Sequence, residues 1–96
     1  MIKTILPGKT IGIIGGGQLG RMLAMSAKEM GYKIAILDPS DMCCAKIFSD
    51  VFIKANFDDF EKVEELCKHS DVITFEFENI DADALNKLEK KYNFVQ

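Results

Sequence analysis

A chain of 96 residues is long enough for one domain with a single hydrophobic core. Its formal net charge is −3, from 15 acidic and 12 basic residues, and this balance argues against a nucleic-acid-binding protein. The sequence contains no apolar run of about 18 residues and no signal peptide, so we expect a cytoplasmic protein without a membrane partner. The three cysteines match no zinc-binding spacing, so we expect free thiols and no metal site.

The first predicted elements are a strand and a helix joined by glycines. Residues 10–15, T-I-G-I-I-G, are apolar on both faces, as in a buried parallel strand. The apolar residues that follow recur at helical spacing and predict a helix whose buried stripe is Leu19, Met22, Leu23, Ala27 and Met30. Gly31 is placed to end that helix in a left-handed conformation.

Three further strands are predicted, over residues 33–38, 51–55 and 71–77. Residues 94–96 resemble the start of a fifth strand. A second helix is predicted to begin at a capping box formed by Asp58 and Glu61. Its expected buried stripe is Phe60, Val63, Leu66 and Cys67.

A last helix is predicted from the N-cap Asp81 onward. The alternation of strand and helix along the chain predicts an α/β fold. We expect a Rossmann-like, doubly wound parallel sheet of four to five strands in the order 3-2-1-4-5, with helices on both faces. Ligands of such sheets bind beyond the carboxyl ends of the strands, where the strand order reverses.

The loop between the first strand and the first helix has the spacing Gly15-x-Gly17-x-x-Gly20. Glycines permit a tight turn and the close approach of a ligand, and the following helix presents free N–H groups and the positive end of its dipole. Dinucleotide-binding proteins use this spacing, with an acid about 20 residues further on, where Asp38 ends the second predicted strand. A full dinucleotide site needs two mononucleotide-binding halves, however, and this chain holds barely more than one.

Three polar side chains at the expected ligand edge are candidates for binding. Gln18 offers an amide at the tip of the loop. Arg21 lies in the first turn of a helix, where a cation opposes the helix dipole by about 0.3–1 kcal/mol, and a nearby phosphate or carboxylate would offset that cost. Glu76 lies on the same side of the fourth strand as Glu78 and could accept hydrogen bonds from a ligand amine or hydroxyl. Each also has a structural interpretation, as a solvated side chain or as a partner of a lysine or helix terminus.

Three segments taken together resemble one family: G-G-G-Q-L-G-R-M at 15–22, L-D-P-S at 37–40 and V-I-T-F-E-F-E-N at 72–79. They are similar to the N-terminal domain of 5-(carboxyamino)imidazole ribonucleotide synthetases, which belong to the ATP-grasp superfamily. The resemblance implies an ATP-dependent ligase of purine biosynthesis that carboxylates aminoimidazole ribonucleotide with bicarbonate. Formate-dependent glycinamide ribonucleotide transformylases have a similar pattern, but they usually carry Glu where Gln18 stands.

The resemblance also implies roles for particular residues. Those implied to face the ribonucleotide are Gly16, Gly17, Gln18, Leu19 and Glu76. Asp38 would be structural or peripheral. ATP and magnesium would bind between two further domains that these 96 residues do not contain. We therefore expect residues 1–96 to form a single pre-ATP-grasp domain with no activity of its own, taken from an enzyme that is a homodimer at full length.

Two other hypotheses stay open on the sequence. The chain could be a freestanding NAD-binding module, in which case binding would depend on Gly17 and Asp38. It could also be an interaction or structural domain whose glycine loop binds no ligand.

Overall fold

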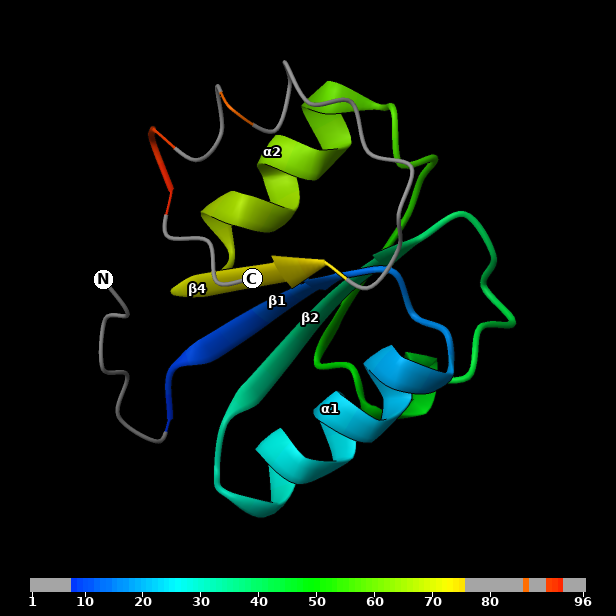
Figure 1. Cartoon of the computed structure of the whole chain (residues 1–96), viewed down its shortest axis with the longest axis vertical. Helices are drawn as coiled ribbons and strands as arrows, with labels where there is room; N and C mark the ends of the chain where they lie inside the picture. The colour runs from blue at the N-terminus through cyan, green and yellow to red at the C-terminus, as the bar shows by residue number, and fades with distance from the viewer. Residues whose placement is uncertain (1–7, 76–85, 87–89, 93–96) are drawn as a thin grey trace.

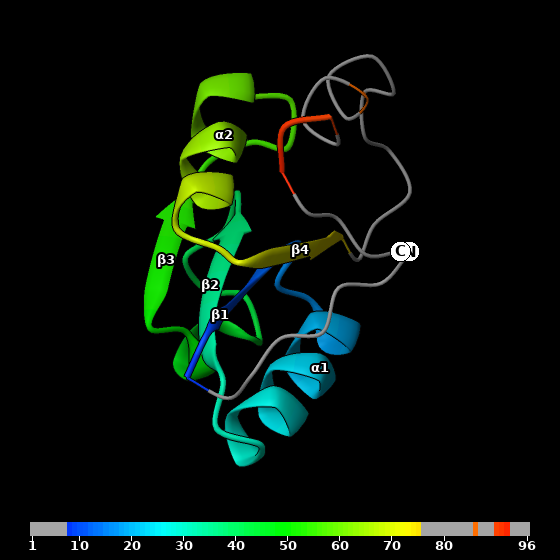
Figure 2. The ribbon, with the colours of Figure 1, turned by 90° about the vertical axis from the view of Figure 1, so that its left-hand side faces the viewer.

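The computed structural model describes residues 8–75, 86 and 90–92. Four parallel strands form one sheet in the order β3-β2-β1-β4. The strands are β1 (Thr10–Ile14), β2 (Lys33–Asp38), β3 (Val51–Lys54) and β4 (Val72–Phe75). Between them lie α1 (Gln18–Glu29), the short 3₁₀ turn η1 (Lys46–Phe48) and α2 (Phe60–Lys68). The predicted α/β fold and the order of its first four strands are confirmed (Figures 1 and 2).

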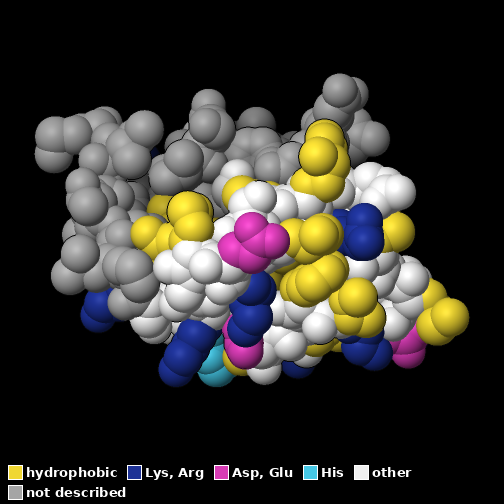
Figure 3. Space-filling model, turned by 90° about the horizontal axis from the view of Figure 1, so that it is seen from below, with side chains coloured by type: hydrophobic (Ala, Val, Ile, Leu, Met, Phe, Trp, Pro, Cys, Tyr) yellow, Lys and Arg dark blue, Asp and Glu magenta, His cyan; other side chains and the backbone are white. Residues whose placement is uncertain are grey.

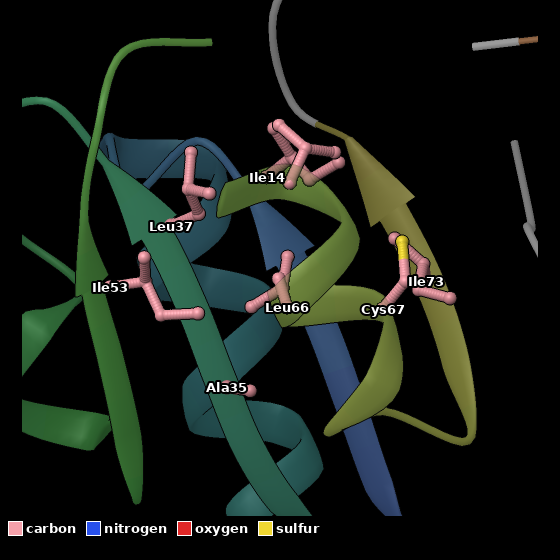
Figure 4. Close-up of a cluster of buried hydrophobic side chains, with 8 residues drawn as sticks. Ile14, Ala35, Leu37, Ile53, Leu66, Cys67 and Ile73 are labelled. Carbon is pink, nitrogen blue, oxygen red and sulfur yellow. The ribbon is translucent and has the colours of Figure 1, made fainter. Parts of the chain in front are cut away.

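The two helices cover opposite faces of the sheet, as Figure 1 shows. Successive residues of a strand point to opposite faces, so β1 contributes Ile13 to one core and Ile14 to the other. The core under α1 contains Ile13, Ala24, Ala27, Ile34, Ile36 and Ala45. The core under α2 is drawn in Figure 4 and contains Ile14, Ala35, Leu37, Ile53, Val63, Leu66, Cys67 and Ile73. Apolar residues on both faces of β1 and β2 therefore produce the doubly wound arrangement.

Helix α1 packs through small residues, which differs from the stripe predicted for it. Its buried residues are Gly20, Ala24 and Ala27. The predicted stripe was right for Ala27 but wrong for Leu19, Met22 and Met30, whose exposed fractions are 65%, 61% and 61%. Small side chains let the helix axis approach the sheet closely, and of the larger predicted residues only Leu23 packs against this core, partly buried. The helix ends as predicted, with Gly31 in a left-handed conformation at φ 91°.

Helix α2 begins one residue later than the predicted capping box implies. The N-cap is Asp59, whose side chain accepts a hydrogen bond from the N–H of Lys62 at 3.3 Å, so the prediction of Asp58 was wrong. Val63, Leu66 and Cys67 are buried as predicted. Phe60 is 38% exposed and is only at the margin of the core.

Several predictions fall on residues outside the described ranges. The fifth strand at 94–96, the helix from Asp81 and the carboxylates of Glu76 and Glu78 are among them. Within the described ranges, no helix has the length and apolar character needed to cross a membrane.

Candidate functional site: the glycine loop

The glycine loop, residues 15–17, joins the carboxyl end of β1 to α1 (Figure 1). Gly15 has φ 107°, which side-chain-bearing residues rarely adopt. Its N–H donates to the carbonyl of Leu37 at 2.8 Å, so the turn starts in hydrogen-bonding contact with β2. At Gly20, one turn into the helix, an added Cβ would overlap the carbonyl oxygen of Gly15. These two glycines are required by the fold itself.

Gly16 is buried, and both of its backbone polar groups are occupied. Its N–H donates to the Asp38 carboxylate at 2.8 Å, and its carbonyl accepts from the N–H of Ala45 at 2.9 Å. A Cβ at Gly16 would lie 2.6 Å from the Cys43 sulfur, so packing also requires a glycine here. The geometry makes Gly16 part of the support of the loop, and the ligand contact expected for it stays a prediction.

Gly17 has different surroundings from the other glycines of the loop. It is exposed, and its backbone is extended, with φ −75° and ψ −160°, a conformation open to any residue. A Cβ added there would meet no atom of the described residues within 4 Å. Packing in the described part of the chain therefore does not require a glycine at this position, although glycine is a favourable N-cap residue.

The N-terminus of α1 opens directly at Gly17. Gly17 is the N-cap, no side chain caps the helix, and the first turn contains no acidic residue. The first N–H groups of a helix have no intrahelical acceptor, and the helix dipole adds partial positive charge to them. Gln18 and Leu19 are exposed beside them. This end of the helix is suited to an anionic or polar ligand group.

Comparison with known proteins decides the family. A family model, the ribonucleotide synthetase preATP-grasp domain, matches residues 8–96. The chain belongs to this family.

The relatives of this preATP-grasp domain include several ribonucleotide synthases. An N5-carboxyaminoimidazole ribonucleotide synthase of Staphylococcus epidermidis is 52% identical over 89 residues, covering 93% of this chain and 24% of that protein. The N5-carboxyaminoimidazole synthetase structure from Staphylococcus aureus matches with a TM-score of 0.94 at 49% identity, covering 97% of this chain and 25% of that one. A structure from Aspergillus clavatus, in complex with ADP and 5-aminoimidazole ribonucleotide, matches with a TM-score of 0.81 at 36% identity, covering 91% and 23%. The chain thus spans about a quarter of the length of these relatives.

Arg21 of this preATP-grasp domain lies against the η1 turn. Its guanidinium carbon is 6.0 Å from the centroid of the Phe48 ring, and the side chain is partly buried. No ion pair to Arg21 is found among the described residues. The cation over the Phe48 ring is a cation–π contact that attaches the first turns of α1 to η1.

Asp38 was the acid expected to bind a ribose hydroxyl if the chain were a dinucleotide-binding module. Its Oδ2 atom accepts the hydrogen bond from Gly16, and its Oδ1 atom accepts one from the N–H of Ser40 at 2.9 Å. The carboxylate is thus committed to backbone groups of its own chain. This is the structural role that the family resemblance implied for Asp38.

The predicted site is only partly assembled within the described residues. Gly17, Gln18 and Leu19 lie together and exposed at the start of α1, whereas Glu76 lies outside the described ranges. Strand β4 runs beside β1 and pairs Phe75 with Ile14. The last described residue of β4 is therefore level with the point where the glycine loop begins.

Sequence reasoning missed the segment 43–45, which supports the loop from the side of β2. Ala45 is fully buried and donates to Gly16, and Cys43 packs beneath the same glycine. Burial, together with the negative charge of Asp38, raises the pKa of the Cys43 thiol. A buried alanine after two adjacent cysteines carries no sequence signal for such a contact, because it depends on how the loop folds back.

Hydrophobic side chains are also exposed around the glycine loop. Seen from the α1 side, they gather over the N-terminal half of α1 and η1, next to lysine and arginine side chains (Figure 3). Large hydrophobic residues exposed in the described part of the chain include Leu19 and Met22 of α1 and Ile47 of η1. Among the described residues, no group of three His, Cys, Asp or Glu side chains could hold a metal ion.

Proposed function

We propose that this chain forms part of the ribonucleotide pocket of an ATP-dependent ligase of purine biosynthesis. The ligase would carboxylate aminoimidazole ribonucleotide, with bicarbonate as the source of the carboxyl group. The similarity to N5-carboxyaminoimidazole ribonucleotide synthases and synthetases supports the reaction class. The structure of the Aspergillus clavatus relative is a complex with ADP and 5-aminoimidazole ribonucleotide. This complex supports an adenine nucleotide and aminoimidazole ribonucleotide as the proposed ligands of the ligase.

The observation that carries the proposal is the open space at Gly17. Its backbone is unstrained, and no atom of the described residues lies within 4 Å of where a side chain would start, so packing in that part of the chain would accept other residues. Glycine is useful at such a point when another molecule approaches the backbone closely. The loop therefore suits a ligand that contacts Gly17 and the N–H groups at the start of α1.

In this proposal, Gly17, Gln18 and Leu19 contact the ribonucleotide, and Gly16 shapes the loop from beneath. Arg21 supplies positive charge that would attract the substrate phosphate. Glu76 would accept a hydrogen bond from the ribose or the amine. The contacts proposed for Gln18 and Glu76 rest on the family resemblance.

ATP and magnesium are assigned to parts of the enzyme other than these residues. The described residues contain no acidic cluster suited to a metal ion, so none of them is given a role toward magnesium. The chain alone is therefore proposed to bind substrate without catalysing the ligation. The complete enzyme is proposed to be a cytoplasmic homodimer.

A dinucleotide-binding module is the second candidate, because the glycine spacing and the acid at the end of β2 are both present. The direction of the Asp38 carboxylate disfavours it, since both oxygens accept hydrogen bonds from the backbone of the chain.

A chimaeric enzyme tests the proposal. This chain would replace the corresponding quarter of the Staphylococcus aureus relative, and ADP formation would be followed as a function of aminoimidazole ribonucleotide concentration. We expect an active enzyme whose KM for the ribonucleotide rises when Gly17 is replaced by Leu, while the KM for ATP stays unchanged. A folded chimaera in which Gly17→Leu leaves the ribonucleotide KM unaltered would contradict the proposed contact.

A further inference from the structure

Asp38, the last residue of β2, is hydrogen-bonded to the backbone of the glycine loop. Its Oδ2 atom accepts from the N–H of Gly16 at 2.8 Å, and its Oδ1 atom accepts from the N–H of Ser40 at 2.9 Å. Hydrogen bonds to an ionised acceptor are stronger than those between neutral groups. The carboxylate therefore ties the end of β2 to the turn that follows β1.

The backbone on either side of Gly16 is thereby fixed in orientation. Its N–H points to Asp38, and its carbonyl accepts from Ala45 at 2.9 Å. In a planar trans peptide, the carbonyl and the following N–H point in opposite directions. The Gly16 carbonyl faces Ala45, so the N–H of Gly17 is turned away from Ala45. Gly17 is exposed, and this N–H adjoins the free N–H groups that begin α1.

We propose that Asp38 is a positioning residue for the ribonucleotide: it sets the orientation of the loop that presents the Gly17 backbone and the α1 N-terminus to the substrate. This inference rests on the proposed function of the glycine loop. Asp38 thus has a role different from that of the acid in a dinucleotide site, because it acts on the loop and not on a ribose hydroxyl.

The first arm of the test needs no ligand. Asp38→Ala and the nearly isosteric Asp38→Asn would be compared with Asp41→Ala, which removes a carboxylate from the segment that follows β2. Asp41 is a suitable control because it faces solvent and is 3.9 Å from the ammonium group of Lys54. Amide hydrogen exchange at Gly16 should be at least about tenfold faster in Asp38→Ala. It should be intermediate in Asp38→Asn, whose amide oxygen keeps one acceptor, and unchanged in Asp41→Ala. Unaltered exchange at Gly16 in Asp38→Ala would overturn the inference.

The second arm measures binding of aminoimidazole ribonucleotide to the same folded variants by amide NMR. We expect Asp38→Ala to raise the Kd about tenfold or more, equivalent to ~1.4 kcal/mol, and Asp41→Ala to leave it unchanged. A purely structural Asp38 would lower stability but leave the Kd of the folded chain as in the wild type, and that result would refute positioning. Failure of the wild-type chain itself to bind would contradict the proposed function, whereas the exchange experiment would still decide whether Asp38 sets the loop.

Discussion

Gly17 and Gly20 are three residues apart, and replacing each by alanine separates a glycine proposed to contact the ligand from a glycine that the fold requires. At Gly17 the backbone is extended, and within the described ranges a Cβ meets no atom closer than 4 Å. Alanine is a poorer N-cap than glycine, by roughly 0.5–1 kcal/mol. It also reduces the entropy of the unfolded chain, which stabilises by about 0.4–1 kcal/mol. The two effects nearly cancel, so Gly17→Ala should change the free energy of unfolding by less than about 0.5 kcal/mol.

At Gly20 the same change should destabilise the protein. Helix propensity alone would favour alanine by about 1 kcal/mol. The added Cβ would overlap the carbonyl oxygen of Gly15, however, and a backbone atom cannot rotate away. Overpacking of this kind typically costs about 1–3 kcal/mol, and this overlap is among the more severe cases. We expect a net loss of at least about 1 kcal/mol, which lowers the Tm of a domain this size by roughly 4–8 °C.

The assay combines thermal unfolding with binding of aminoimidazole ribonucleotide to each variant. Gly17→Ala should unfold like the wild type and lose binding by about tenfold or more, because its Cβ occupies the space proposed for the ligand. Gly20→Ala should melt earlier. A Gly17→Ala variant that binds as tightly as the wild type would refute the reasoning that an external molecule accounts for this glycine.

Three further predictions concern the framework. Leu66→Ala should reduce the free energy of unfolding by about 2–5 kcal/mol in urea titrations, since Leu66 is fully buried, whereas Leu19→Ala, at a position 65% exposed, should change it little; equal effects would contradict the assigned core. The Asp50 carboxylate accepts hydrogen bonds from the Lys28 ammonium group and from the N–H of Ile34, and these bonds, with the charge of Lys28, lower the pKa of Asp50 from its ordinary value. The ionised carboxylate therefore stabilises the fold at pH values above its ordinary pKa. This stabilisation should be lost as the pH falls through the lowered pKa, so Asp50→Asn should flatten the acid side of the curve of unfolding free energy against pH. A variant whose curve matches that of the wild type would contradict the stabilising role of Asp50. Burial raises the pKa of Cys67 to about 12, so a thiol reagent at neutral pH should modify the exposed Cys44 well before Cys67, and early labelling of Cys67 in the folded chain would contradict its burial.

The sequence was a good guide to the sheet because both faces of its central strands are apolar. Ile13 and Ile14 must be buried on opposite sides, and only helices on both faces achieve that. Neighbouring strands are then parallel because a helix or, between β2 and β3, the 3₁₀ turn η1 connects each strand to the next one along the chain.

The packing of α1 was harder to predict, because counting large apolar residues selected the wrong face. Gly20, Ala24 and Ala27 recur at helical spacing and form the contact surface, since close approach to β1 leaves no room for a larger side chain. A stripe of small residues was therefore the informative signal. Leu19 and Met22 are apolar but exposed, beside the proposed ligand site.

The position of the glycine loop was predicted from the sequence, but its hydrogen bonds and packing were not. The glycine spacing located the loop, yet it could not distinguish the glycines that the fold requires from Gly17. Nor could it show that the Asp38 carboxylate turns toward Gly16, because sequence gives the distance along the chain and not the direction of a side chain.

The most direct test of the account is an amide NMR titration of the chain with aminoimidazole ribonucleotide and, separately, with NAD. The account predicts shifts at Gly17, Gln18 and Leu19 with the ribonucleotide and none of comparable size with NAD. Shifts with NAD that extend to Asp38, without a response to the ribonucleotide, would contradict it and identify the loop as a dinucleotide site.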